Sequence, residues 1–156
     1  MKTGKSLAAL AVAFSLALGL PGIAAETTTH DGHDAAALEI LLNNGAKWQG
    51  DQNMIAGMTA IRDAVAANLT AIHGGALSAD AAREMAGAIQ AQLDFMLGNC
   101  VLEPAVDEQF HIVLAQVIDG VSDLEAGNAQ DGPVKIVEAL NAYGEHFEHP
   151  GWQSFH

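Results

Sequence analysis

The sequence predicts an all-α protein, an up-down-up-down four-helix bundle with a short helical extension at its N-terminal end. Three observations favour this fold class. Apolar residues recur at three- and four-residue steps in four long segments, the spacing of one buried helix face. Short connections containing Gly, Pro and Asn separate these segments, as between antiparallel neighbours in a bundle. No segment shows the sustained two-residue alternation that predicts a strand.

Residues 1–25 have the pattern of a secretory signal peptide. Lys2 and Lys5 form a basic start, residues 7–20 are an apolar run, and small residues at 24–25 suit cleavage. The run is short for a membrane span, and an uncleaved anchor is the less favoured alternative. We therefore expect export to the periplasm, with no membrane attachment after cleavage.

The mature chain is predicted to be one domain over residues 35–156, preceded by a polar, flexible lead-in at 26–34. A short helix over 35–45 opens the domain and ends at Gly45, because glycine favours the end of a helix. The four long helices are expected at residues 51–72, 78–98, 104–125 and 133–148.

Local signals support the boundaries of these long helices. Ser78 is a predicted N-cap, and Pro104 and Pro133 suit first helical positions. The apolar stripes predict which faces are buried. They consist of Met58, Ile61, Val65, Leu69 and Ile72; Met85, Ile89, Leu93 and Met96; Val106, Phe110, Val113, Val117 and Leu124; and Ile136, Leu140, Tyr143 and Phe147.

The chain is strongly acidic, with a formal net charge of −13. Cleavage would remove Lys2 and Lys5 and leave four basic side chains against 19 acidic ones. This balance argues against nucleic-acid binding, which depends on basic patches. An acidic surface attracts cations or basic partners, although the acidity equally serves solubility alone.

Chain order predicts that several potential metal ligands lie at one end of the bundle. In an up-down-up-down bundle the first helix starts, the second ends, the third starts and the fourth ends at the same end. Sulfur and imidazole donors together suit copper, especially Cu(I). The candidate ligands at this end are Met58, Cys100, His111, His146 and His149.

Two further residues are candidates for supporting roles. Asp107 lies four residues before His111, so the two share a helix face, and a carboxylate there can orient the imidazole. Tyr143, on the last helix, is expected somewhat nearer to the same end of the bundle than His111. Structural roles remain the alternative for all of these candidates: core packing for the sulfur residues, and surface positions at a helix C-terminus for the terminal histidines.

Cys100 is the single cysteine, which excludes an internal disulfide. It is a buried thiol, a metal ligand or an intermolecular link, and the last of these would produce a homodimer. No CxxCH motif for haem attachment is present. Neither is a nucleophile–base motif, a phosphate loop or HExxH, so we do not predict an enzyme. A di-iron bundle would require two Glu-x-x-His motifs, and only Glu108 and His111 have that spacing.

Residues 110–119, the Gly-Asn loop after them and Asn141-Ala142-Tyr143 resemble the second half of cytochrome b562, a relative of the cytochromes c-prime. Met58, followed by Ile61 and Asp63, resembles the start of its first helix. The resemblance covers most of the mature bundle. It implies a periplasmic four-helix bundle that binds haem b and transfers electrons, an alternative to the copper protein.

The same resemblance implies Met58 as an axial haem ligand. The axial histidine of the family directly follows the Asn-Ala-Tyr sequence, where this chain has Gly144. His146 or His111 would have to replace it, and Gly57, Gly98 and Gly144 would leave room for a porphyrin. A third alternative is a structural or partner-binding module without a cofactor.

Overall fold

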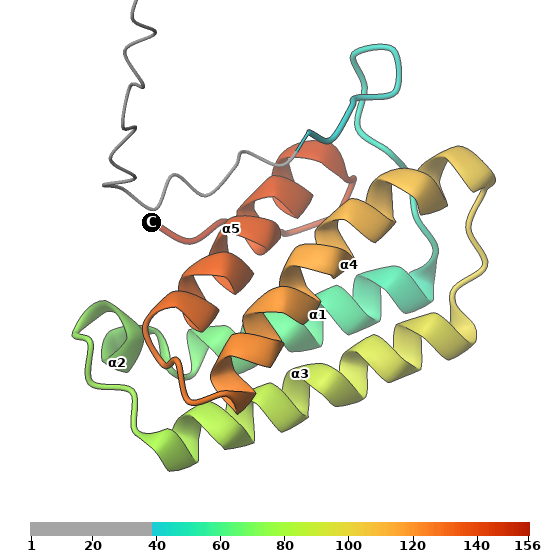
Figure 1. Ribbon diagram of the computed structural model, residues 1–156. Helices are drawn as coiled ribbons and strands as arrows, with labels where there is room; N and C mark the ends of the chain where they lie inside the picture. Colours follow the sequence, from blue (N-terminus) through green and yellow to red (C-terminus); the bar gives the residue numbers. More distant parts are fainter. Residues whose placement is uncertain (1–38) are drawn as a thin grey trace, which may run out of the picture. The chain divides into compact units, whose positions relative to one another are not determined.

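The computed structural model describes residues 39–156, so the predicted signal peptide (1–25) and lead-in (26–34) lie outside the described range. Within this range all regular elements are helices, which confirms the all-α part of the prediction. None of its helices is both long enough and apolar enough to cross a membrane. The helices are α1 (Gln52–Ala66), α2 (Leu69–His73), α3 (Ala79–Asn99), α4 (Pro104–Glu125) and α5 (Asp131–His146) (Figure 1).

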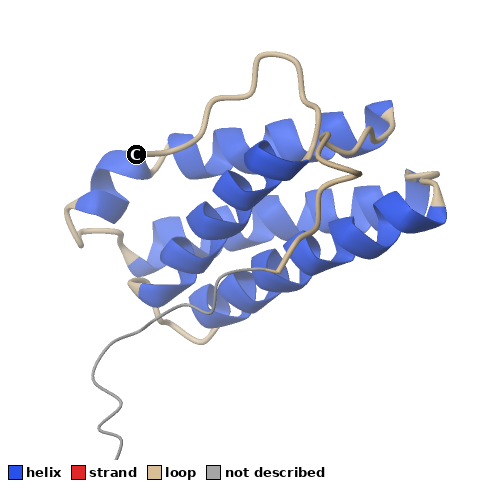
Figure 2. Cartoon of the chain, turned by 90° about the horizontal axis from the view of Figure 1, so that it is seen from above, coloured by secondary structure: helices blue, strands red, loops and turns tan. Residues whose placement is uncertain are grey.

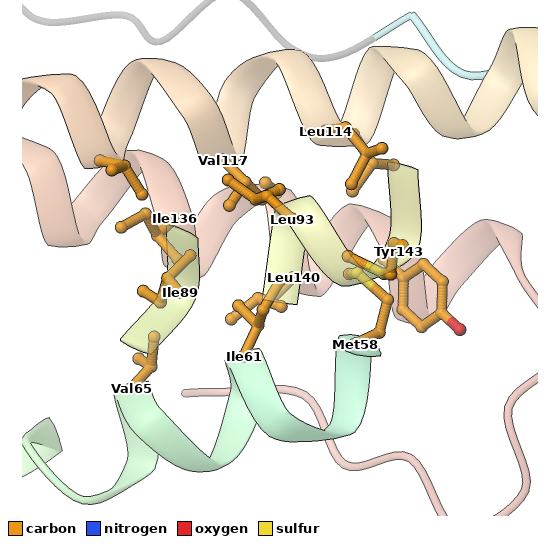
Figure 3. Close-up of a cluster of buried hydrophobic side chains, with 14 of the residues drawn as sticks. Met58, Ile61, Val65, Ile89, Leu93, Leu114, Val117, Ile136, Leu140 and Tyr143 are labelled. Atoms are coloured by element: carbon orange, nitrogen blue, oxygen red, sulfur yellow. The ribbon is translucent and has the colours of Figure 1, made fainter. Parts of the chain in front are cut away.

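The four longer helices pack along one another around a shared apolar core. α4 contacts α3 and α5, and α1 contacts α3 and α5, and Figure 2 shows them running side by side. The predicted stripes of α3 and α5 are buried along their whole length. In Figure 3 the side chains of α1, α3, α4 and α5 converge; the labelled residues are Met58, Ile61, Val65, Ile89, Leu93, Leu114, Val117, Ile136, Leu140 and Tyr143.

The first long helix is shorter than predicted. The expected helix over 51–72 is divided into α1 and α2 by a turn at Ala67 and Asn68. The Asn68 side-chain amide donates a hydrogen bond to the Ala64 carbonyl at 3.0 Å. Asparagine competes with the helical backbone in this way, which gives a local reason for the break.

The boundaries of α3 and α4 agree with the predicted signals. Ser78 is the N-cap of α3, and its hydroxyl accepts a hydrogen bond from the Ala81 N–H at 3.2 Å. α4 begins at Pro104. A proline is tolerated there because the first N–H groups of a helix have no partner within the helix.

The last helix is shifted two residues towards the N-terminus relative to the prediction of 133–148. It begins at Asp131, whose N–H donates to the Asn128 side-chain oxygen at 3.1 Å. It ends at His146 because Phe147 is extended and forms a parallel bridge with Trp48. The predicted end missed this pairing, which joins residues almost 100 positions apart.

The prediction of a short helix over 35–45 is wrong for its described part, residues 39–45, which contain no helix. Asn43 and Ala46 exchange two backbone hydrogen bonds across a tight turn. The central residues Asn44 and Gly45 have φ values of 51° and 88°. Asn-Gly suits this left-handed turn geometry, so Gly45 belongs to a turn rather than a helix end.

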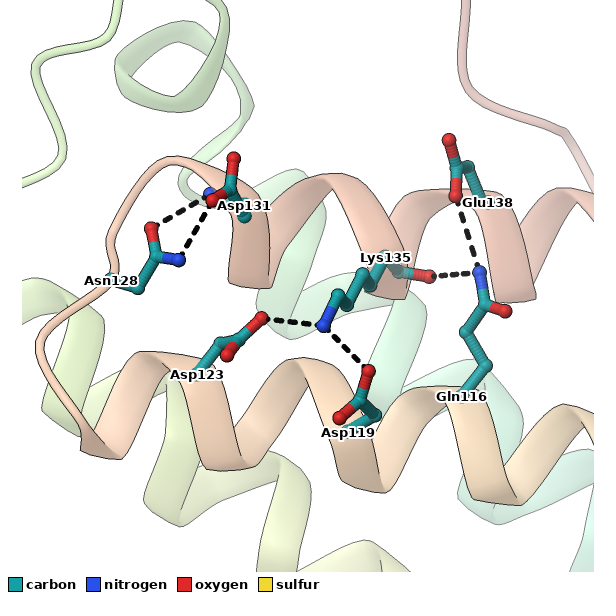
Figure 4. A network of polar contacts seen from close by, with 7 residues as sticks. All are labelled: Gln116, Asp119, Asp123, Asn128, Asp131, Lys135 and Glu138. Atoms are coloured by element: carbon teal, nitrogen blue, oxygen red, sulfur yellow. Dashed lines mark hydrogen bonds and ion pairs between the residues drawn. The ribbon is translucent and has the colours of Figure 1, made fainter. Parts of the chain in front are cut away.

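α4 and α5 are held together at the end that carries their connecting loop. A Cβ on Gly120 would lie 2.7 Å from the Gly132 carbonyl oxygen, so the two backbones approach as only glycine permits. Lys135 contacts Asp119 at 2.6 Å and Asp123 at 2.8 Å (Figure 4). Hydrogen bonds to these two carboxylates raise the pKa of Lys135. Such solvent-exposed pairs contribute little to stability individually.

Candidate functional site

Hydrogen bonds join the helix ends that the sequence places together. Asp51, the N-cap of α1, accepts the Met54 N–H with one carboxylate oxygen and the Val101 N–H with the other, each at 2.7 Å. Asn53 of α1 donates to the carbonyl of Asn99, the last residue of α3, at 2.8 Å. The α3–α4 connection, which carries Cys100, is therefore fixed to the start of α1.

A small cavity of about 140 Å³ lies where α3 meets α4. We call it the Cys100 cavity. It brings together two of the five predicted ligands, Cys100 and His111, with the predicted supporting residue Asp107. It also includes Met96, which was not among the candidate ligands. The complete lining consists of Met96, Leu97, Cys100, Leu102, Asp107, Phe110, His111 and Leu114.

The Cys100 thiol is kept protonated by its surroundings. Burial, the charges of Asp51 and Asp107, and a hydrogen bond to Asp51 raise the pKa of Cys100 to about 11. The same carboxylate of Asp51 has a lowered pKa: burial opposes ionisation, but hydrogen bonds from Met54, Val101 and Cys100 outweigh it. A thiolate would form here only if a cation replaced the proton, because the nearby charges are negative.

His111 is oriented as a potential ligand. Its Nδ1 lies 2.8 Å from the Asp107 carbonyl oxygen and 3.5 Å from the Asp107 carboxylate. A carbonyl oxygen only accepts hydrogen bonds, so Nδ1 carries the proton and Nε2 retains its lone pair in the neutral ring. Metal-binding histidines are commonly held in this way. The predicted pairing of Asp107 with His111 is present, but its closer contact is through the main chain.

Met58, a predicted ligand, lies outside the Cys100 cavity, whereas Met96, predicted only as part of a buried stripe, lines it. Met58 has no exposed surface and points into the core beside Tyr143 (Figure 3). Met96 is also buried and packs on Gly57 of α1, where a Cβ would lie 2.4 Å from its sulfur. Met96 lines the Cys100 cavity and Met58 does not. The signal for Met96 was its position four residues before Cys100.

The two remaining predicted ligands, His146 and His149, lie outside the Cys100 cavity. His146 Nδ1 is 2.7 Å from the Ala142 carbonyl oxygen, within its own helix. Both ring nitrogens of His149 are engaged. Nδ1 is 3.0 Å from the Tyr143 hydroxyl, and Nε2 is 3.2 Å from the Thr59 hydroxyl.

His149 begins a C-terminal segment (residues 149–155) that lies against α1 and α5. The Trp152 ring is centred 4.8 Å from both Tyr143 and His149. The Asn141 side chain donates to the Phe155 carbonyl and accepts the Phe155 N–H. The sequence did not predict this docking, although the aromatic residues Trp152 and Phe155 beyond the last helix were a signal for it.

Arg62 of α1 also holds this segment. Its Nε donates to the Gln153 carbonyl at 2.7 Å. Its guanidinium carbon is 5.9 Å from the centre of the Trp152 ring and 5.2 Å from that of Phe155, within the range of cation–π attraction. Sequence reasoning did not include Arg62, one of the few cations of this acidic chain, in the site.

The residues that would surround a haem of the cytochrome b562 kind do not fit that group. A Cβ on Gly144 would lie 2.3 Å from Trp152 Nε1, so the indole fills the space beside the expected ligand position. Met96 fills the space beside Gly57, whereas Gly98 is open. Gly144 therefore accommodates a tryptophan of the same chain, and it supplies no ligand.

Among residues 39–156, no three His, Cys, Asp or Glu side chains are already grouped to hold a metal ion. Any ion at the Cys100 cavity would therefore also need the thioether of Met96 or a ligand of its own. Comparisons with family models, curated proteins and solved structures found no match to this chain.

Proposed function

We propose that this chain is an exported helical protein that binds a soft metal ion, copper(I) above all, at the Cys100 cavity. A single observation supports this most strongly: one small cavity is lined by a thiol, an imidazole and a thioether, those of Cys100, His111 and Met96. This donor set favours Cu(I). The protein would store, deliver or sense the ion in the periplasm, or transfer electrons through it.

Each of the three residues has a defined part in this proposal. Cys100 would exchange its proton for the ion, which makes binding proton-coupled. His111 would supply Nε2 while the Asp107 carbonyl holds Nδ1–H. Met96 would supply its thioether from the buried side. Met58, His146 and His149 are not in the proposed ligand set. The up-down-up-down order of the four long helices is part of the proposal, supported by the contacts of α1 and α4 with both α3 and α5.

The experiment is a Cu(I) competition titration under anaerobic, reducing conditions with a chromophoric Cu(I) chelator. We expect one ion per chain. Cys100→Ser should weaken binding by about 100-fold or more, because it removes the thiolate. His111→Asn and Met96→Leu should each weaken binding by roughly 10-fold, in the range of losses measured at metal sites.

His73→Asn is the matched control, because His73 is an exposed histidine that does not line the cavity. It should leave the affinity unchanged. Equal Cu(I) affinity in the wild type and in a Cys100→Ser, His111→Asn double variant would exclude the proposed site.

Exposed apolar residues beside the cavity favour a second candidate function, docking of a protein partner. The side chains of Leu97 and Val101 are 61% and 85% exposed, and Leu97 also lines the cavity. Apolar side chains are costly to expose when they cluster, and clusters mark contact surfaces. Light scattering tests the simplest partner, a second copy: a dimer that Val101→Ser dissociates would support this function, and a monomer at all concentrations would exclude self-association.

A further inference from the structure

The hydrogen-bond pattern around His149 assigns its tautomer. The Thr59 hydroxyl donates its proton to the Ile55 carbonyl at 2.8 Å, so towards His149 it can only accept. His149 Nε2 therefore carries the ring proton. Nδ1 is then the acceptor for the Tyr143 O–H. The chain of donors thus runs in one direction, from Tyr143 through His149 to Thr59 and Ile55.

This pattern requires a neutral imidazole. Tyr143 is fully buried, and burial, followed by the nearby Cys100, raises its pKa, so its hydroxyl keeps its proton. A proton on Nδ1 would make both His149 nitrogens donors and would remove the acceptor of the Tyr143 O–H. A buried hydroxyl without its acceptor is destabilising.

The surroundings of the His149 ring also favour its neutral form. α1 contributes Thr59 and Arg62, α5 contributes Tyr143, and the C-terminal segment contributes Trp152. Burial and then the positive charge of Arg62 lower the pKa of His149 below its usual 6.5. Asp63 pairs with Arg62 at 3.7 Å, and His149 takes part in none of the ion pairs found among residues 39–156.

The C-terminal segment is held by separable contacts rather than by continuous secondary structure. Trp152 fills the space beside the backbone of Gly144, which we call the Gly144 notch. The Phe155 main chain forms two hydrogen bonds with the Asn141 side chain, and the Gln153 carbonyl accepts one from Arg62. The Trp152 indole nitrogen is buried without a hydrogen-bond partner, which makes the closed position of this ring costly. His149 is the titratable group at the start of this segment.

We propose that the C-terminal segment is a clasp over α1 and α5 that is closed while His149 is neutral and opens when His149 takes up a proton. Opening would expose the Gly144 notch and the Trp152 and Phe155 rings. This inference does not depend on the metal proposal, because none of its residues lines the Cys100 cavity.

The direction of the pH dependence follows from the two states. In the open clasp His149 regains its usual pKa, so the open form binds more protons than the closed form. The closed form is therefore fully favoured above about pH 6.5 and loses stability as the pH falls towards the lowered pKa of the closed state. Across that window, each unit by which the pH falls should raise the equilibrium ratio of open to closed clasp by up to about 10-fold.

The test is an NMR titration of the full chain from about pH 8 to about pH 4.5, the range in which histidine titrates. We expect the Trp152 indole and Phe155 amide signals to change together. Their common midpoint should equal the titration midpoint of the His149 ring, which should lie below pH 6.5. The Trp48 indole, which donates to Leu41 away from the clasp, should not follow this transition.

His149→Gln should abolish the coupled transition, and the matched variant His146→Gln should retain it. Arg62→Gln provides a second test if His149→Gln does not fold: loss of the cation should raise the midpoint towards 6.5. The proposal is overturned if the Trp152 and Phe155 signals do not titrate in the wild type, if they still titrate in His149→Gln, or if Arg62→Gln leaves the midpoint unchanged.

Discussion

The Cys100 cavity lies where α3 ends and α4 begins, whereas the C-terminal clasp runs along α1 and α5. Cys100 and His111 both line the cavity, where the thiol is hydrogen-bonded to Asp51 and Nδ1 of His111 to the Asp107 carbonyl. In the clasp, both nitrogens of His149 already have partners. The cavity leaves space beside these two side chains, whereas the clasp uses its polar groups to hold the chain to itself.

This difference separates histidine and sulfur residues that look equivalent in the sequence. A ligand site needs an atom with a free lone pair beside open space. A structural site needs the same atom fully satisfied and covered. His111 lines the cavity, whereas His149 has a hydrogen-bond partner on each ring nitrogen. The following predictions compare the two regions directly, in order of decreasing effect.

The largest expected difference is between truncating the central residue of each region. Tyr143→Ala should lower the free energy of unfolding by about 3–5 kcal/mol, the range for large buried aromatic residues. Tyr143 is fully buried, and its ring stacks on Phe147 with centroids 5.2 Å apart. Cys100→Ala, at a half-buried position, should cost about 1 kcal/mol or less. Urea denaturation measures both, and equal losses would contradict the assignment of the cavity as a non-structural site.

The second prediction concerns the reactivity of Cys100. With a pKa of about 11 instead of 9.0, its thiolate fraction at about pH 8 should be roughly 100-fold below that of an unperturbed thiol. Alkylation by iodoacetamide should be slower by a similar factor. Asp51→Asn, which removes the charge but can still cap α1, should accelerate it about 10-fold. A rate in the folded wild type equal to that of the unfolded chain would contradict this environment.

Much of the fold could be predicted because its signals are local. The N-cap Ser78, the start at Pro104 and the buried stripes of α3 and α5 depend on residues within one or two helical turns. The errors occur where distant contacts decide. The end of α5 depends on the Trp48–Phe147 bridge, and no periodic pattern within α5 contains that information.

The grouping of residues at the Cys100 cavity could be predicted in part for a similar reason. Chain order places helix ends, so the grouping of Cys100, Asp107 and His111 could be expected. It does not determine the rotation of each helix about its axis. Met58 therefore points into the core while Met96 lines the cavity, although both lie at the same end. The docking of residues 149–155 depends on Arg62 and Asn141, whose roles appear only in three dimensions.

A third prediction uses one glycine from each region. Gly98→Ala should stabilise the chain by about 0.5–1 kcal/mol, because a Cβ there meets no atom within 4 Å and alanine is the better helix former. Gly144→Ala should instead destabilise it by about 1–2 kcal/mol, because the Cβ would displace Trp152. Thermal unfolding separates the two effects, and stabilisation by Gly144→Ala would show that the indole is not needed in the notch.

The smallest expected effect tests the direction of the hydrogen bonds in the clasp. Tyr143→Phe should cost only about 1 kcal/mol, the net value of one hydrogen bond, because the ring still fills the core. It should nevertheless raise the pKa of His149, because proton uptake would no longer leave a buried hydroxyl without an acceptor. An NMR titration of the His149 ring in the wild type and the variant measures this. If Nδ1 instead carried the proton and donated to the tyrosine oxygen, removing that acceptor would not favour the protonated ring. An unchanged or lowered pKa of His149 would therefore reverse the assigned direction and remove the chemical basis of acid opening.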